Sequence, residues 1–280
     1  MDLSKAKTLL IIAFLSLNIF LGYKLWIAPR SLSPSSVLTQ AQLEQTEALL
    51  KEHGFDLKTA LPRQIPRLAL LNVSRLVQDD AYWVSAFLGA QEVWSQRQED
   101  RTVYTTGQET LTIFANGHVF YTNNLPGIDE ANTRVLAERY LRDWKLWQNN
   151  MKLDLAVPWG QHGFRYRFVE TYQGFPLFFS AIEVYLTDGR PREVHIYQVQ
   201  PHGFSDKETA VISAQKAVQT FIKEAAAVSS KSIIDISLGY YSLSYDAERW
   251  ESAPVWRIAT QDGGESYINA FTGEVEKTTF

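Results

Sequence analysis

The feature that most constrains this chain is an apolar run near its amino terminus, at residues 8–27. Twelve of these twenty positions are Leu, Ile or Phe. As an α-helix, about 20 residues rising ~1.5 Å each cross the hydrocarbon core of a bilayer. Insertion of the twelve side chains contributes roughly 4 to 7 kcal/mol, and Lys24 lies near one end, where its amine can reach the lipid headgroups. The sequence therefore predicts a single transmembrane anchor.

A cleaved signal peptide is the alternative interpretation of the same run. Its apolar core is long for a signal peptide, and Lys24–Pro29 lacks the paired small residues of a cleavage site. Lysine or arginine flanks both ends of the run, so the count of basic residues does not settle the orientation. Because lysines in a short tail abut the apolar run, we expect residues 1–7 in the cytoplasm and the rest of the chain outside the cell.

The composition limits which kinds of domain and functional site can follow the anchor. The chain has 280 residues and a formal net charge of −4, so the remainder is long enough for one large domain or several small ones. No concentrated run of Lys and Arg is present, which argues against a nucleic-acid partner. The chain has no cysteine, which excludes disulfides, thiolate metal sites and cysteine catalysis.

The sequence beyond the anchor predicts a linker followed by a membrane-proximal α+β unit. Residues 28–38 are rich in Ser and Pro, which is typical of a linker. In residues 39–127 a helix begins at a capping box of Thr39 and Gln42 and ends at Gly54. Alternating apolar residues on both sides of Asn116-Gly117 predict a β-hairpin, and these two residues tolerate the positive φ of a type I′ turn.

Residues 128–203 are predicted to form a helix followed by three antiparallel strands. Asp129 caps a helix that runs to about Trp147. Turns are expected at Gln173-Gly174 and Asp188-Gly189. The strand between these turns does not alternate cleanly, so it should contain a bulge.

Residues 204–280 repeat this layout. Ser205 and Glu208 form a capping box before a helix with a well-formed apolar stripe, and three or four strands follow, the last at Glu274–Thr278. The predicted fold class is therefore α+β. It consists of a single transmembrane helix followed by two helix-plus-antiparallel-sheet units, with residues 39–127 as a looser third copy.

Two parts of the sequence resemble known families. Tyr267–Val275 is similar to the closing hairpin of PepSY-type modules, which pack a helix on a small antiparallel sheet and usually lie outside the cytoplasmic membrane. The opening Asp2–Thr8, the Leu17–Leu21 part of the anchor and the total length resemble the YycI family, membrane-anchored regulatory proteins of Gram-positive bacteria.

The resemblance to the YycI family implies a function in signal transduction. It implies a single-pass protein of the cell membrane that associates with a YycH-like protein. Together the two would contact the sensor histidine kinase of the WalK/WalR (YycG/YycF) two-component system, which controls cell-wall metabolism. The resemblance also implies no catalytic residues, and it places much of the contact in the membrane-spanning helices.

The residues of the anchor offer one candidate for such contact. Phe14, Asn18 and Gly22 are four residues apart and share one helix face. An amide in hydrocarbon gains roughly 0.6 kcal/mol, and up to about 2, by bonding to another helix, and glycine allows close approach. The alternative is that one Asn is simply tolerated in a strongly apolar span. We therefore take Phe14, Asn18 and Gly22 as the candidate partner-binding face.

Sequence motifs for catalysis, cofactors and metals were not found. The five histidines show no metal-ligand spacing, and the glycines read as turn residues rather than a phosphate loop. Glu170 and Glu183 could face each other as a glycosidase-like pair, but spacing alone says little without a cleft. We expect no catalytic, cofactor-binding or metal-binding residue.

The tryptophans leave open which surface binds a partner. We expect most of five tryptophans in or near the two repeated units to be core, with an exposed protein-binding surface as the alternative; they are Trp144, Trp147, Trp159, Trp250 and Trp256. Two other functions also remain open: a single-span scaffold of a cell-wall assembly, and a wall-acting hydrolase, which would need a cleft with convergent polar groups.

Overall fold

The computed structural model describes residues 3–22, 36–76, 78–89, 91–224, 231–243 and 247–276. The chain divides into two compact units, Met1–Ser33 and Pro34–Phe280. The first contains helix α1, Leu3–Gly22. Residues 23–27 of the predicted anchor and 28–35 of the predicted linker lie outside the described residues. Among the helices that the structure describes, none combines the length and apolar character needed to cross a membrane.

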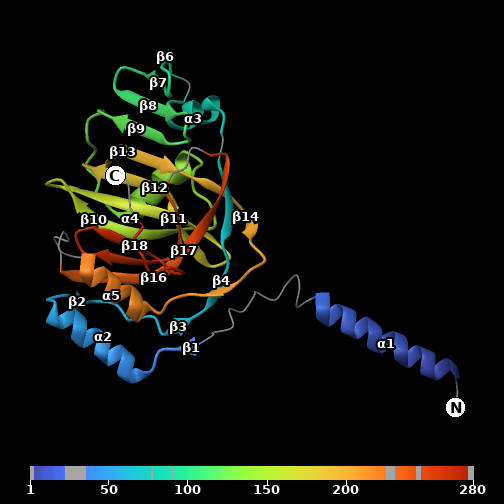
Figure 1. Ribbon diagram of the computed structural model, residues 1–280. Coiled ribbons are helices and arrows are strands. Elements are labelled where there is room, and N and C mark those ends of the chain that lie inside the picture. The colour runs from blue at the N-terminus through green and yellow to red at the C-terminus, as the bar shows by residue number, and fades with distance from the viewer. Residues whose placement is uncertain are drawn as a thin grey trace. The chain divides into compact units, whose positions relative to one another are not determined.

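The second unit is an α+β fold (Figure 1). Its helices in the described ranges are α2 (Gln40–Glu52), α3 (Asp80–Phe87), α4 (Arg134–Asp143) and α5 (Ala214–Glu224). The strands of its first half are β1 (Ser36–Val37), β2 (Asp56–Leu57), β3 (Gln64–Ile65), β4 (Arg67–Leu68), β5 (Leu71–Arg75), β6 (Trp94–Arg97), β7 (Arg101–Thr105), β8 (Glu109–Phe114) and β9 (Val119–Asn123). Those of the second half are β10 (Met151–Trp159), β11 (Gly163–Tyr172), β12 (Phe175–Thr187), β13 (Arg190–Tyr197), β14 (Val199–Phe204), β15 (Thr209–Ala210), β16 (Ser232–Tyr241), β17 (Arg249–Thr260) and β18 (Glu265–Asn269).

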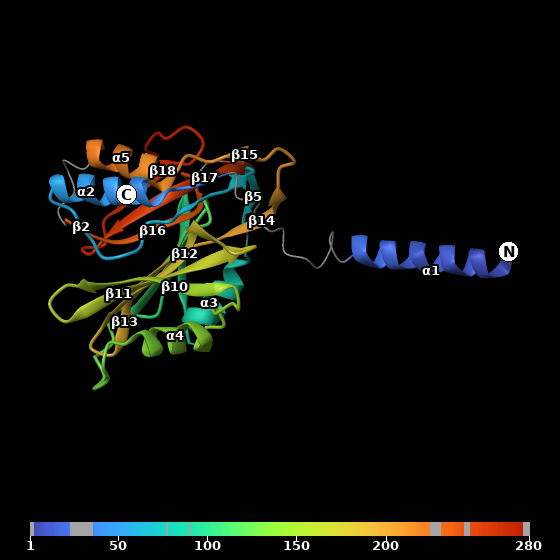
Figure 2. The same cartoon turned by 90° about the horizontal axis from the view of Figure 1, so that it is seen from below.

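Most of the described strands belong to one large, mainly antiparallel sheet. Its main path runs β14-β5-β17-β16-β12-β13-β9-β8-β7-β6, with β10, β11, β18 and β2 paired to it at the side. Figure 2 shows α2 and α5 on one side of the strands and α3 and α4 on the other. The strands between these helix pairs lie in two layers, β16–β18 beneath α2 and α5, and β10–β13 above α4.

Each helix pair covers its own hydrophobic core. Leu50 of α2 and Phe221 of α5 pack with Trp256 of β17, and all three are almost fully buried. On the other side, Leu141 of α4 packs with Phe168 of β11. Burying apolar residues on one face of each layer leaves the opposite strand faces to meet each other between the layers.

One long strand, β12, pairs with strands of both layers. Residues 178–180 of β12 have no partner on β11, because Val169 pairs with Ala181 and Glu170 with Leu177. This confirms the predicted bulge. Beyond it, Leu177 pairs with Tyr240 of β16, so β12 belongs to both layers. Strand β17 pairs with β5 at one end and with β16 and β18 at the other.

The division into units at 39–127, 128–203 and 204–280 stays a prediction. The observed pairing links strands across these boundaries, since β5 of the first span pairs with β14 of the second and β17 of the third. The last predicted strand is present only as a bridge between Ile268 and Val275 among the described residues. Residues 277–280 lie outside them.

Local turn motifs are largely as predicted. Gln173-Gly174 and Asp188-Gly189 each have positive φ at both residues, 47° and 90° in the first pair and 52° and 70° in the second, as in type I′ turns. The hairpin at Asn116-Gly117 is confirmed, but its predicted turn type is wrong. Only Gly117 has positive φ, at +87°, and its N–H donates to the carbonyl of Phe114 over 2.9 Å. A turn over residues 114–117 that ends in a left-handed glycine fits a three-residue hairpin loop.

The first predicted helix start is confirmed and the other two are wrong. Thr39 and Gln42 form both bonds of the capping box of α2. Helix α4, however, is capped by Thr133 rather than Asp129 and ends at Asp143. The side chain of Asn132 accepts from the N–H of Gly189 and donates to the carbonyl of His162, which holds the preceding segment in a loop.

Helix α5 also starts later than the Ser205 and Glu208 motif predicts. It begins at Ala214, where the hydroxyl of Ser213 accepts from the N–H of Lys216. The reason is long-range pairing, because Thr209 and Ala210 form β15 with Arg67 and Leu68 of β4. Strand pairing to a distant segment therefore overrides the local capping signal.

Candidate functional site

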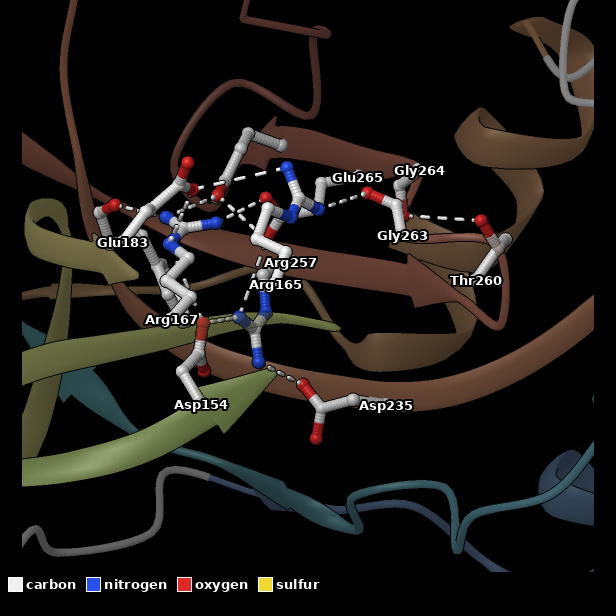
Figure 3. Close-up of polar contacts among 12 residues, drawn as sticks. Asp154, Arg165, Arg167, Glu183, Asp235, Arg257, Thr260, Gly263, Gly264 and Glu265 are labelled. Carbon is white, nitrogen blue, oxygen red and sulfur yellow. Dashed lines mark hydrogen bonds and ion pairs between the residues drawn. The ribbon is translucent and has the colours of Figure 1, made fainter. Parts of the chain in front are cut away.

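A cluster of charged side chains lies buried between the two strand layers (Figure 3). At its centre are Arg167 of β11 and Arg257 of β17, whose side chains are only 7% and 4% exposed. Four carboxylates from four other strands surround them: Asp154 of β10, Glu183 of β12, Asp235 of β16 and Glu265 of β18.

Strand alternation brings these residues together. Trp256 and Ile258 belong to the core beneath α2 and α5, so Arg257 between them points to the opposite face of β17. Tyr166 and Phe168 belong to the core beneath α3 and α4, and Arg167 between them points away from that core in the same way. The two arginines therefore meet in the space between the layers.

Arg257 is held by three carboxylates and one ring. Its Nη1 donates to Asp154, and its Nη2 donates to Asp235 over 2.8 Å. Nη1 also lies 3.3 Å from Glu265. The guanidinium carbon is 4.4 Å from the ring centroid of Phe178, the geometry of a cation–π contact. Strands β10, β16, β18 and β12 thus all contact one side chain.

Arg167 contacts carboxylates of the same cluster from the other layer. Its Nη1 donates to Glu265, and its Nη2 donates to the carbonyl of Phe178 and, over 3.2 Å, to the hydroxyl of Tyr267. Its Nε lies 3.8 Å from Asp154 and 3.9 Å from Glu183. Glu265 and Asp154 therefore each contact both arginines.

The electrostatics keep both arginines charged. Burial opposes the charged form of Arg167, but electrostatic interactions with Tyr267, Glu265 and Asp154 outweigh it and raise its pKa. Burial likewise opposes the charge of Arg257, and Asp154 and Glu265 raise its pKa overall. Burial is also the main cause of the raised pKa of Tyr267. The guanidinium groups therefore stay protonated near neutral pH.

The chemistry of this cluster suits a structural connection between the two strand layers. Guanidinium groups do not exchange protons near neutral pH, so the arginines are not acid–base groups. Within the described ranges, no group of three or more His, Asp or Glu side chains is arranged to hold a metal ion. The cluster holds the two layers in one register, since shifting either layer would leave buried charges without partners.

The two glutamates considered as a catalytic pair, Glu170 and Glu183, are not opposite each other in the strand pairing. Glu183 is opposite Arg167, and Glu170 is opposite Leu177. Glu170 is buried and accepts a hydrogen bond of 2.5 Å from the side chain of Gln198. Burial raises the pKa of Glu170, and hydrogen bonds from Gln198, Ser180 and Asn150 partly oppose the shift.

The predicted partner-binding residues lie in the other compact unit. Phe14 and Asn18 are exposed positions of α1, and Gly22 is its last residue. Their spacing places them along one side of the helix. Their role in binding stays a prediction.

Comparison with known proteins identifies the family. The family model described as YycI protein matches residues 34–271, most of the chain. The chain belongs to the YycI family. This is a family of regulatory proteins rather than enzymes, connected with the WalK/YycG two-component system. No curated protein matches the chain in sequence.

Two solved structures are similar over most of their length. An uncharacterized protein from Eubacterium rectale is 10% identical, with 80% of this chain and 90% of that chain covered and a TM-score of 0.48. The Bacillus megaterium YpeB C-terminal domain is 16% identical, with 72% of this chain and 97% of that chain covered and a TM-score of 0.37.

Sequence reasoning missed the buried cluster, although a signal for it was present. Arg257 interrupts the apolar run Val255–Ala259, and Arg167 lies between two aromatic residues in β11. A charged residue at the centre of an otherwise apolar strand needs a partner of opposite charge. Which carboxylates supply it depends on strands that are up to about a hundred positions apart in sequence, such as Asp154 and Arg257.

We predict that Arg257→Ala destabilises the protein by about 3–5 kcal/mol, because Asp154 is left buried without its main partner. The free energy of unfolding of the full chain in urea measures this. The control is Arg134→Ala, which removes an arginine from the exposed i,i+4 pair with Glu138 and should cost only about 0.5 kcal/mol. Equal effects for the two variants would contradict a cluster-specific role.

We predict that Glu170→Gln gains stability relative to the wild type as the pH rises. A raised pKa in the folded state means that Glu170 stabilises the fold below its unfolded pKa, about 4.3, and that this contribution is lost as the pH rises through the folded pKa. Glutamine can still accept from Gln198 but does not ionise. Urea unfolding between about pH 4 and pH 7 measures the difference, with Glu47→Gln on the exposed face of α2 as the control. A difference that does not change with pH would contradict the assignment.

Proposed function

We propose that this protein is a membrane-anchored, extracytoplasmic regulator that binds a WalK-type sensor histidine kinase and modulates its output, together with a YycH-like partner. The observation that carries the proposal is the match of residues 34–271 to the YycI family. The membrane anchor is part of the proposal and rests on the sequence, in which the apolar run continues to Ile27, past the last described residue of α1.

The proposed activity is a coupling free energy rather than a chemical step. A regulator shifts a kinase between its states only by binding them with different affinity. A difference of a few kcal/mol changes the ratio of the two states by a factor of 100 or more, at about 1.4 kcal/mol for each factor of ten. The regulator therefore needs a defined contact surface and no catalytic group.

The proposed contact in the membrane runs along Phe14, Asn18 and Gly22. An amide such as that of Asn18 has no hydrogen-bond partner among lipid tails, so bonding to a helix of the kinase or of a YycH-like protein satisfies it. Phe14 lies one turn before and Gly22 one turn after, which gives the contact a ring to pack and a site of close approach.

We predict that Asn18→Leu weakens co-purification with the kinase or with the YycH-like partner in mild detergent and changes the kinase's output. The matched control is Ser16→Leu, which makes the same helix more apolar on a different face. Co-purification and the autophosphorylation of the kinase in membranes measure the two effects. If Asn18→Leu behaves like the wild type in both assays, the helix contact is wrong; localisation to a wall-synthesis assembly without the kinase would favour a scaffold instead.

A further inference from the structure

One end of the large sheet is an open strand edge. Strand β6 pairs with β7 through four residue pairs from Trp94 to Arg97. It is the last strand on its end of the sheet, and none of the described strands pairs with its other side. All four of its residues are exposed.

The hydrogen-bonding pattern shows which backbone groups point outward. The N–H of Gln98 donates to the carbonyl of Arg101 over 2.8 Å, which closes the β6–β7 hairpin. In an antiparallel pair, residues alternate between bonding to the partner strand and pointing away from it. Gln96 and Trp94 therefore bond to β7, and the N–H and C=O groups of Ser95 and Arg97 point to the open side.

Other strands at the margins of this sheet carry features that block strand addition. Strand β14 contains Pro201 and a register shift next to it. Strand β10 contains Pro158 and a register shift between Leu153 and Leu155. Proline, bulges and twisted edges are the usual protection against a further strand. Strand β6 has no proline, no glycine and no register shift.

A cleft lies beside this edge. Its volume is about 410 Å³, and its lining includes Ser95 and Arg97 of β6, Tyr104 of β7 and Asp80 of α3. Asp80 accepts a hydrogen bond of 2.8 Å from Tyr104, and burial with this contact raises the pKa of Tyr104 to about 12. Glu99, Asp100 and Arg101 complete the charged part of the lining. Three carboxylates against two guanidinium groups give the cleft a net negative charge.

The opposite face of β6 presents an aromatic side chain. Trp94 is 65% exposed, and alternation places it on the face away from the Ser95 and Arg97 side chains. The ring of a tryptophan favours both apolar and cationic neighbours. An added strand would therefore meet a negative cleft on one face and an open aromatic ring on the other.

We propose that β6 binds an extended segment of another protein by strand addition, with a basic side chain of that segment in the cleft. Four residues at about 3.4 Å each make an edge of roughly 14 Å, which fits a short strand. A stable dimer of this chain would bury about 800 Å² and roughly 20–30 residues on each partner, whereas β6 has only four residues. The proposal depends only on β6 and its cleft, so it stands or fails separately from the kinase-binding function.

The test uses a blocked six-residue peptide of alternating threonine and valine with one central lysine. It is titrated into the full-length protein while backbone amide shifts are recorded by NMR. We expect saturable shifts at Ser95 and Arg97. Ser95→Pro removes an outward N–H without removing a bond to β7 and should weaken binding about tenfold, the effect of losing one or two hydrogen bonds and the strand register. Ser95→Thr, which keeps the N–H, should bind like the wild type.

A second probe keeps the test independent of whether Ser95→Pro folds. The same peptide with all of its backbone amides N-methylated has no N–H to donate along either edge, so it should not shift these amides. A peptide with glutamate in place of the lysine should bind more weakly because of the negative cleft. Absence of shifts with the lysine peptide at millimolar concentration, or equal binding by the N-methylated peptide, would overturn strand addition; equal binding by the glutamate peptide would overturn the basic side chain.

Discussion

Two buried guanidinium groups between the strand layers are the constraint on which the rest of the fold depends. Arg167 and Arg257 come from different layers, and both contact Asp154 and Glu265. Taking one layer away from the other would leave charges in a poorly solvated interior, at a cost of several kcal/mol for each ion. Apolar cores beneath the two helix pairs hold each layer to its helices, but they do not align one layer with the other. The charge cluster does, together with β12, which pairs with strands of both layers.

This arrangement bears on how a regulatory protein of the YycI family can act. A binding protein changes its target only if its surface distinguishes the target's states. Strand β12 pairs with strands of both layers, and the charge cluster lies between β12, β17 and their neighbours. The layers therefore behave as one body, and the open edge at β6 belongs to that body through β7, β8 and β9. We expect a surface of this kind to keep its shape when a partner binds.

Features set by neighbouring residues could be predicted from the sequence, and features set by distant ones could not. The capping box of Thr39 and the turn at Gln173-Gly174 need only a few residues, and both are present. The same kind of capping signal failed at Ser205 because residues 209–210 pair with β4. Arg257 could be recognised as a charge in an apolar strand, but its partner Asp154 could not, since their contact needs the finished fold. The face of Phe14, Asn18 and Gly22 was predicted from spacing, and only a partner can test it.

Native-state hydrogen exchange of the full chain tests the central claim most directly. If the cluster joins the layers into one cooperative body, the amides of Phe168 in β11 and Ile258 in β17 exchange through the same opening, with equal free energies and equal dependence on urea. In Arg257→Ala, the two amides should separate, with one layer opening before the other. Different opening free energies for Phe168 and Ile258 in the wild-type protein would show that the layers open independently, and this would contradict the account.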